Sequence, residues 1–132
     1  MLRYAYFSDL KFGPKFLFWG SPSDMSRLRE ALDQVANGVS SLPLSSLPSS
    51  KSVDGSTVVL KAVPRTSGFR KTLRGQLDFD WGLDRETALQ FSEMVAVLAT
   101  SKRPGHQYLE SIRSEDVTVM VSCDEYPDDL AP

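Results

Sequence analysis

The sequence contains very few residues that bind metals or form disulfides. Among 132 residues there is one cysteine, Cys123, and one histidine, His106. A single cysteine excludes a disulfide within the chain, and this agrees with a reducing compartment. One Cys and one His are also too few for a zinc site of the usual kind. We therefore predict a domain that is stabilised by an apolar core, with no metal and no cofactor.

The sequence also lacks long apolar runs. No stretch approaches the roughly 18 consecutive apolar residues that cross a bilayer. The first residues, MLRYAYFSDLKFG, contain neither the basic region nor the continuous apolar stretch of a signal peptide. We therefore expect a cytoplasmic protein without membrane association.

Several motifs of nucleotide-binding and hydrolytic sites are missing. Neither GxGxxG nor a phosphate-binding P-loop occurs, and GxSxG and HExxH are absent. The basic segment SGFRKTLRG, residues 67–75, has suitable charges for phosphate contacts, and Phe69 is a candidate for stacking on a base. However, the net charge of the chain is −2, so binding to nucleic acid is not favoured.

The charges are distributed unevenly along the chain. Residues 61–74 include five basic side chains and no acidic one, namely Lys61, Arg65, Arg70, Lys71 and Arg74. Residues 110–129 include one basic side chain, Arg113, and seven acidic ones, namely Glu110, Glu115, Asp116, Asp124, Glu125, Asp128 and Asp129. Two interpretations are open: the two segments are solvated surfaces that pair with each other, or the acidic end is a docking surface for a basic partner.

Two amphipathic helices are clearly indicated. The first begins at SPSD, where Ser21 is the expected N-cap and Asp24 completes a capping box, and it ends at Asn37-Gly38. Its apolar residues, from Met25 to Val35, recur at helical spacing. The second begins after Asp84 as N-cap and ends before Pro104-Gly105.

Most of the remaining sequence has the pattern of strands. The residue ranges are 2–8 and 15–20, which flank Gly13-Pro14 as a hairpin, then 57–63, 72–82, 106–112 and 117–122. A turn around Ser114-Glu115 is expected to join the last two. Alternating polar residues, as in 72–82, are typical of antiparallel sheets with one wet face. The order predicts an α+β fold, with two helices packed on one face of a mainly antiparallel sheet in a ferredoxin-like or related βαββαβ order, plus an added N-terminal hairpin.

The whole chain, residues 1–132, reads as a single domain. Residues 39–56 are rich in serine and proline without any periodicity, so we expect a surface loop there, which Leu42, Leu44 and Leu47 are able to anchor. Residues 124–132 are acidic and are expected to form a solvated C-terminal tail.

Two candidate constellations for chemistry remain. His106 and Cys123 form the single Cys–His pair that is available for nucleophilic catalysis, if a hairpin brings them together. A histidine with a structural role and a buried thiol are the simpler interpretation. Asp78 and Asp80 lie two residues apart and are possible cation ligands, but this spacing also follows from the polar face of any amphipathic strand.

The segments FWGSPSDMSRLREAL, RPGHQYLE and VTVMVSCDEYPDDL together resemble small uncharacterised bacterial proteins, some of which look like immunity proteins of toxin–immunity systems. The resemblance covers most of the chain except the serine-rich loop. It implies a small cytoplasmic protein that binds another protein and has no catalytic residues.

The function expected from these observations is non-catalytic protein binding, and an immunity protein would inhibit a cognate basic toxin domain through the acidic surface. The candidate partner-binding residues are Asp78, Asp80, Tyr108, Glu110, Asp124, Glu125, Tyr126, Asp128 and Asp129. The alternative is a small enzyme or ligand-binding protein with a pocket near His106, Tyr108 and Cys123. Assembly into a homo-oligomer through an apolar strand or aromatic patch is a third option.

Overall fold

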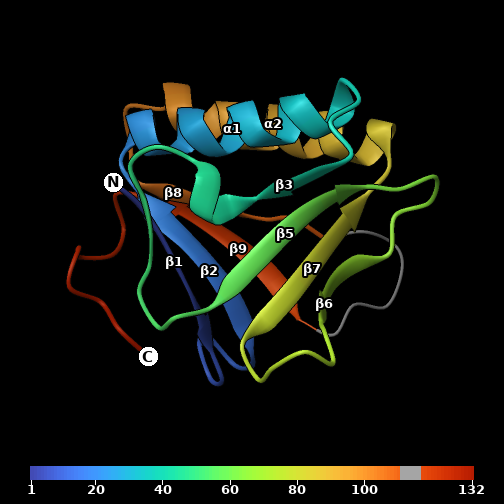
Figure 1. Ribbon diagram of the computed structural model, residues 1–132. Helices are drawn as coiled ribbons and strands as arrows, with labels where there is room; N and C mark the ends of the chain where they lie inside the picture. Colours follow the sequence, from blue (N-terminus) through green and yellow to red (C-terminus); the bar gives the residue numbers. More distant parts are fainter. Residues whose placement is uncertain (111–116) are drawn as a thin grey trace.

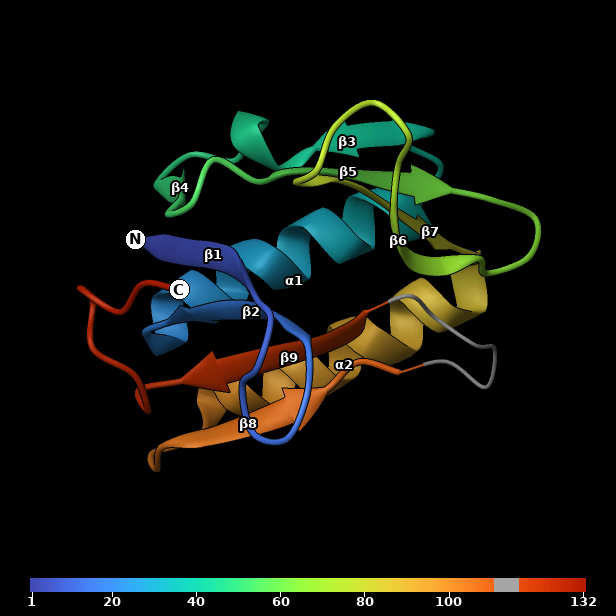
Figure 2. The same ribbon diagram turned by 90° about the horizontal axis from the view of Figure 1, so that it is seen from below.

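Two helices and two β-sheets form the described part of the chain, residues 1–110 and 117–132, in a computed structural model (Figure 1). Helix α1 spans Pro22–Ala36 and helix α2 spans Arg85–Thr100. The helices lie side by side across one side of both sheets, and Figure 2, seen from the opposite side, shows the two sheets as separate layers. None of the described helices is long and apolar enough to cross a membrane.

The larger sheet, sheet A, has five strands in the order β4-β1-β2-β9-β8. These strands are β4 (Ser50–Ser52), β1 (Leu2–Phe7), β2 (Lys15–Gly20), β9 (Thr118–Cys123) and β8 (Gly105–Tyr108). The β1–β2 and β8–β9 pairs are antiparallel, whereas β1–β4 and β2–β9 are parallel. The expected N-terminal hairpin is therefore confirmed, as is the pairing of the strand after His106 with the last strand. The turn expected around Ser114-Glu115 lies outside the described residues.

The smaller sheet, sheet B, has four strands in the order β3-β5-β7-β6. They are β3 (Ser41–Pro43), β5 (Thr57–Ala62), β7 (Asp78–Leu83) and β6 (Gly68–Lys71). Strands β5 and β7 are parallel, and the other two pairs are antiparallel. The expected strand over residues 72–82 is shorter than predicted, because a turn occupies residues 73–77 and leaves Leu73 fully exposed.

The α+β class and the two helices are confirmed, but the prediction of one mainly antiparallel sheet is wrong. Both sheets are mixed, and the ferredoxin-like order is not confirmed because the strands are divided between two sheets. The strands after α2 belong to a different sheet because α2 follows β7 of sheet B and leads into β8 and β9 of sheet A. Alternation along a strand identifies its two faces but not its neighbours.

Both helices begin as the sequence predicts. Ser21 and Asp24 form the complete capping box of α1. Asp84 is the N-cap of α2, and its carboxylate accepts a hydrogen bond of 2.8 Å from the backbone N–H of Thr87. Helix α2 ends at Thr100, before Pro104-Gly105 as expected.

Both faces of sheet A are buried. On its inner face, Phe16 and Phe18 contact sheet B, with ring centroids 4.6 Å from Phe69 and 5.8 Å from Trp81 respectively. On its outer face, a second apolar cluster consists of Ala5, Phe7, Leu17, Trp19 and Met120. The four consecutive residues 16–19 of β2 are therefore all core residues, two on each face of the sheet. Other segments of the chain have to cover the outer cluster.

The serine-rich residues 39–56 contain more structure than expected. They include β3, the short 3-10 helix η1 (Leu44–Ser46) and β4. Strand β3 forms an edge of sheet B, and β4 forms an edge of sheet A. Leu44 and Leu47 are buried in the main core, and this explains how a segment of low periodicity acquires a fixed path.

Candidate functional site

The C-terminal segment, residues 124–132, folds back over the outer face of sheet A. Asp124 follows β9 with a φ of 58°, a left-handed conformation that aspartate adopts more readily than most residues. Its backbone N–H donates to the carbonyl oxygen of Gly20 at 2.9 Å. This turn directs the next residues across the outer cluster.

The segment contacts the sheet through two of its residues, while its other seven residues are exposed. Tyr126 and Leu130 contact the outer cluster, and Trp19 Nε1 donates a hydrogen bond of 3.2 Å to the carbonyl oxygen of Pro127. Arg3 Nη1 lies 3.2 Å from Oδ1 of Asp128. The apolar residues are held on the sheet, while most of the carboxylates stay at the surface.

Glu125 connects the C-terminal segment to strands β8 and β9. His106 Nδ1 lies 3.0 Å from its Oε1, and Ser122 Oγ donates a hydrogen bond to the same oxygen. Burial alone would raise the pKa of Glu125, but the hydrogen bonds from Ser122 and His106 and the nearby charge of Lys11 lower the pKa below its ordinary value. The charged carboxylate is therefore the form that holds the segment in place.

This cluster does not have the arrangement of a catalytic triad. Ser122 is fully buried, and its hydroxyl donates to the carboxylate of Glu125 instead of to the imidazole of His106. A nucleophilic serine needs an exposed hydroxyl and a base within hydrogen-bond reach. The role of His106 is to anchor the C-terminal segment.

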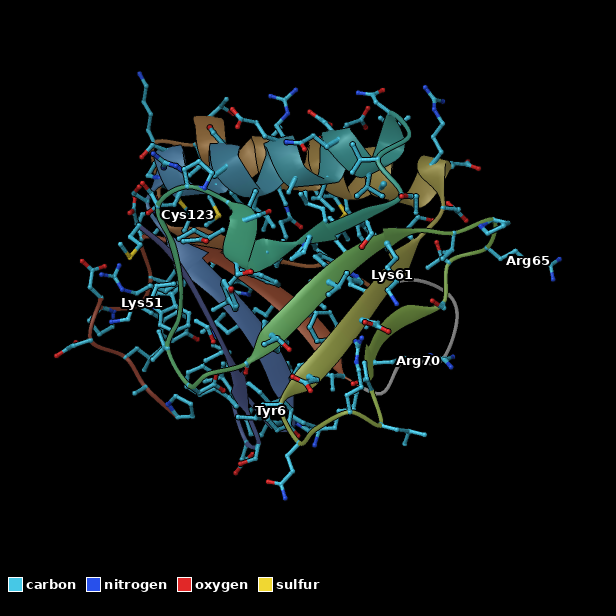
Figure 3. The ribbon with its side chains drawn as sticks, in the orientation of Figure 1. Tyr6, Lys51, Lys61, Arg65, Arg70 and Cys123 are labelled. Carbon is cyan, nitrogen blue, oxygen red and sulfur yellow. The ribbon has the colours of Figure 1, made fainter. Side chains whose placement is uncertain are left out.

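The His106–Cys123 pair expected as an alternative is not formed. Cys123 is 1% exposed and belongs to the inner core, and Figure 3 shows it close to the helix layer. His106 is instead paired in register with Ser122 and faces outward. Burial, and then the carboxylates of Asp124, Asp24 and Glu125, raise the pKa of the Cys123 thiol to about 11. The sheet therefore separates the two groups, and Tyr108 lies on the histidine side.

Aromatic side chains surround the anchored segment. Tyr108 packs on the outer cluster, with its ring centroid 5.5 Å from that of His106. Lys11 Nζ lies 5.9 Å from the ring centroid of Tyr126. Between Lys11 and the second strand of the hairpin, Phe12 is completely exposed. We refer to the residues 9–12, His106, Tyr108 and 124–132 together as the C-terminal face.

Phe12 was not singled out by the sequence, because it is one of seven aromatic residues within the first nineteen. Its neighbour Gly13 provides the signal that was available, since a residue beside the glycine of a hairpin turn is displayed away from the sheet. Lys11 and Phe12 both have positive φ, at 49° and 71°, so the turn extends over them.

The structure brings together some of the candidate binding residues and separates others. Tyr108, Glu125 and Tyr126 meet on the C-terminal face, with Asp124, Asp128 and Asp129 on the same segment. Glu110 is exposed and follows Tyr108 at the end of β8 that is farther from the start of the C-terminal segment.

Asp78 and Asp80 lie on the outer face of sheet B. Thr57 donates a hydrogen bond to Asp78, while Asp80 is 3.0 Å from Lys61 Nζ and 3.0 Å from Arg74 Nη2. Asp80 therefore neutralises part of the positive charge of the basic segment. Phe69, the candidate for base stacking, is fully buried against Phe16.

Among the described residues, no ion pair joins the basic segment of sheet B to the C-terminal carboxylates. The same part of the chain contains no group of three or more acidic, histidine or cysteine side chains that would hold a metal ion. Comparisons with protein-family models, with curated proteins and with solved structures found no match. We therefore infer the function from the structure of the molecular surface.

Proposed function

We propose that this chain is a non-catalytic, cytoplasmic protein-binding module that docks a basic protein partner on the C-terminal face, and that the partner is a toxin domain which it inhibits. The observation that carries the proposal is the C-terminal segment itself. It contains four carboxylates and no basic residue among its nine positions; Glu125 anchors the segment, and Asp124, Asp128 and Asp129 are exposed.

Preorganisation supports this assignment. Contacts of Tyr126 and Leu130 with the outer cluster and the hydrogen bond from Trp19 hold the backbone of the segment. Carboxylates on a fixed backbone lose less conformational entropy on binding than those on a mobile tail. An acidic segment also accelerates encounter with a basic partner and selects against acidic ones.

Phe12 supplies the apolar contact that such an interface needs. Charged groups at the rim of an interface contribute mainly to association rate, whereas a few aromatic residues provide most of the binding free energy. Phe12 is fully exposed at the tip of the hairpin, beside Lys11, whose ammonium group contacts Tyr126. The Phe12 side chain is not part of the core, so the whole ring is available to contact a partner.

The enzyme alternative has less support. It requires His106, Tyr108 and Cys123 to converge on one pocket, but the thiol belongs to the inner core while the two rings lie outside. The buried hydroxyl of Ser122 does not replace the thiol as a nucleophile, because it is occupied by Glu125.

The proposal is tested with the purified protein and the products of the genes that flank its own gene. Each product is mixed with the wild type, with Phe12→Ala and with Leu73→Ala, and binding is measured by calorimetry. Leu73 is the matched control, because it is equally exposed but lies on the turn of sheet B. We expect one product to bind and Phe12→Ala to weaken it by about 10-fold or more, as for interface anchors.

Several results would contradict the proposal. Absence of binding to every flanking product would remove the toxin-partner assignment. Equal effects of Phe12→Ala and Leu73→Ala would show that the C-terminal face is not the docking surface. Light scattering on the protein alone provides a further check, since a stable homo-oligomer that buries Phe12 would assign this face to self-association.

A further inference from the structure

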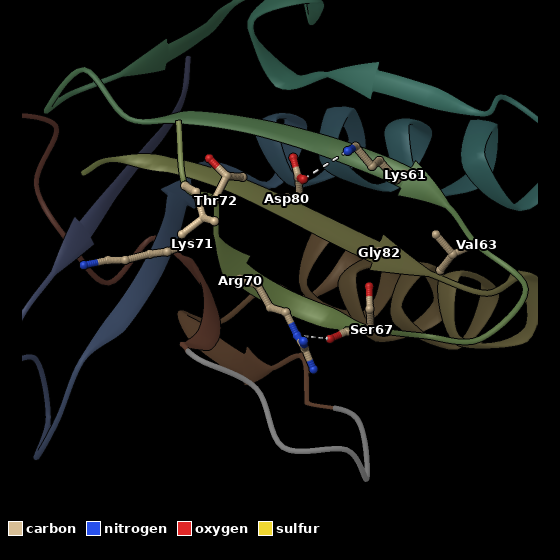
Figure 4. A pocket seen from close by; sticks show the side chains of 9 residues that line it. Lys61, Val63, Ser67, Arg70, Lys71, Thr72, Asp80 and Gly82 are labelled. Atoms are coloured by element: carbon tan, nitrogen blue, oxygen red, sulfur yellow. Dashed lines mark hydrogen bonds and ion pairs between the residues drawn. The ribbon is translucent and has the colours of Figure 1, made fainter. Parts of the chain in front are cut away.

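A pocket of about 520 Å³ lies on the outer face of sheet B (Figure 4). Strands β5, β6 and β7 and the turn after β6 form its walls. Its polar lining includes Lys61, Ser67, Arg70, Thr72 and Asp80, with Gly82 among the lining residues. This volume is within the range of small-molecule sites in proteins.

The pocket depends on a glycine at position 82. A Cβ built at Gly82 would collide with the hydroxyl of Ser67, which lies over this part of β7. Gly68, the next residue after Ser67, has a φ of 85°, a left-handed conformation that suits glycine. Gly68 is paired in register with Gly82, so the two glycines lie where β6 begins beside β7 and the Ser67 hydroxyl enters the lining.

The charges of the lining favour an anion. Asp80 is the one acidic residue among those that line the pocket, and both Lys61 and Arg74 pair with it at 3.0 Å. Three basic residues, Lys61, Arg70 and Lys71, line the pocket against this one carboxylate, so the pocket keeps an excess of positive charge. A dianion is more strongly attracted by this excess than a carboxylate with a single charge.

Arg70 is held in a fixed position at this site. Its Nε donates a hydrogen bond of 2.8 Å to the carbonyl oxygen of Ser67, which uses one edge of the guanidinium and orients the remaining N–H groups. The planar guanidinium is well suited to bidentate contacts with phosphate oxygens. The hydroxyls of Ser67 and Thr72 add donors of the kind that bind phosphate, and Val63 and Leu73 provide apolar walls for an organic group.

From this combination we infer that the pocket on sheet B binds a small phosphate monoester, with the phosphate between Lys61, Arg70 and the Ser67 hydroxyl. The inference does not depend on the proposed protein partner, which docks on the C-terminal face. It also differs from nucleic-acid binding by the basic segment, which the sequence does not favour, because Phe69 is buried and offers no surface for base stacking.

The test uses the full chain and three probes of known chemistry: inorganic phosphate, glycerol 3-phosphate and acetate, all at equal ionic strength. Binding is followed by the chemical shifts of backbone amides in two-dimensional NMR. We expect saturable shifts for the two phosphates at Ser67, Gly68 and Gly82, and tighter binding of glycerol 3-phosphate than of inorganic phosphate. Acetate is expected to produce no saturable shifts at these amides.

Charge-neutral variants locate the site. Arg70→Gln is expected to weaken binding of glycerol 3-phosphate about 10-fold or more, because a charged hydrogen-bonding partner of the phosphate is lost. Arg65→Gln is the matched control, since Arg65 belongs to the same basic segment but projects from the tip of the loop between β5 and β6, away from Lys61 and Arg70 (Figure 3). Its effect is expected to stay within about two-fold, as for a screened surface charge.

Three outcomes would overturn the inference. The first is the absence of saturable binding by either phosphate, and the second is an equal loss of affinity in Arg65→Gln and Arg70→Gln, which would indicate a general effect of charge. The third is binding of a short single-stranded oligonucleotide at this site more tightly than glycerol 3-phosphate, which would assign the surface to nucleic acid. Ser67→Ala changes no charge. An unchanged affinity for glycerol 3-phosphate in this variant would show that the Ser67 hydroxyl does not bind the phosphate.

Discussion

His106 Nδ1 lies 3.0 Å from Oε1 of Glu125, across the junction between strand β8 and the C-terminal segment. The only histidine of the chain therefore holds a carboxylate in place, and this carboxylate connects the C-terminal segment to the sheet. The residue most suggestive of catalysis therefore contacts the carboxylate that holds the C-terminal segment.

The anchoring by Glu125 predicts a specific dependence on pH. Because hydrogen bonds and charge lower the pKa of Glu125 in the folded state, its contribution to stability is complete above the unfolded pKa of about 4.3 and is lost as the pH falls through the lower folded value. We expect the C-terminal segment to loosen in this acidic range. The NMR signal of the Trp19 indole N–H, which donates to Pro127, is the direct measure.

Glu125→Gln and Glu93→Gln form the matched pair for this measurement. Glu125→Gln is expected to shift the Trp19 signal towards its acid position already at neutral pH and to remove most of the acid transition. Glu93 is exposed on α2, so its substitution is expected to leave the titration unchanged. A Trp19 signal that titrates identically in all three proteins would contradict the anchoring role.

Asp84 is predicted to be important for stability at the junction of β7 and α2. Its carboxylate caps α2 at the Thr87 N–H, and its own N–H donates to Thr66 Oγ1 at 2.9 Å. Asp84→Ala is expected to lower the free energy of unfolding in urea by about 1–2 kcal/mol, as for other N-cap residues. Glu86→Ala, in the same first turn, serves as the control with an expected change below about 0.5 kcal/mol.

The lowered pKa of Asp84 gives this prediction a pH signature. The hydrogen bond from the backbone of Thr87 is the main cause of the shift, and it outweighs the effect of burial. The difference in unfolding free energy between wild type and Asp84→Ala is therefore expected to be complete above the unfolded pKa of about 3.9. It is expected to shrink as the pH falls through the lower folded pKa of Asp84. A difference that stays constant into strong acid would show that the capping carboxylate is not its source.

Cys123 is predicted to be unreactive in the folded protein. It is buried, and burial together with neighbouring carboxylates raises its pKa to about 11, so very little thiolate exists at neutral pH. We expect a disulfide reagent to modify the native protein at least about 100-fold more slowly than the protein unfolded in urea. Rapid stoichiometric modification of the native chain would reopen the possibility of a functional thiol.

The helices and the hairpin were predictable because their signals are local. SPSD before α1 and Asp84 before α2 specify helix starts within a few residues, and Gly13-Pro14 marks the turn between β1 and β2. The sheet arrangement was not predictable in the same way. Strands β2 and β9 are parallel neighbours although Lys15 and its partner Thr118 are far apart in the sequence. A period of two carries no information about such a partner.

The candidate site was predictable in its charges but not in its packing. DEYPDDL appears solvated because acidic residues dominate it, yet Tyr126 and Leu130 lie on one side of the segment and cover the outer cluster. The signal for this covering layer was the run FLFW in β2, since apolar residues at consecutive positions require both faces of the strand to be buried. The phosphate pocket depends on Gly82 and Ser67, whose proximity arises only in the folded sheet.

Charge-neutral variants test directly whether the proposed partner binds the C-terminal face. The decisive measurement is the affinity of the partner encoded by a flanking gene for two double variants that change the net charge equally. Asp128→Asn with Asp129→Asn alters the C-terminal face, whereas Glu30→Gln with Glu93→Gln alters the exposed sides of α1 and α2. We predict that the first pair weakens binding about 10-fold and reduces its dependence on salt, while the second pair leaves both nearly unchanged. Equal effects of the two pairs, or no effect of the first, would contradict the proposal that this face binds the partner.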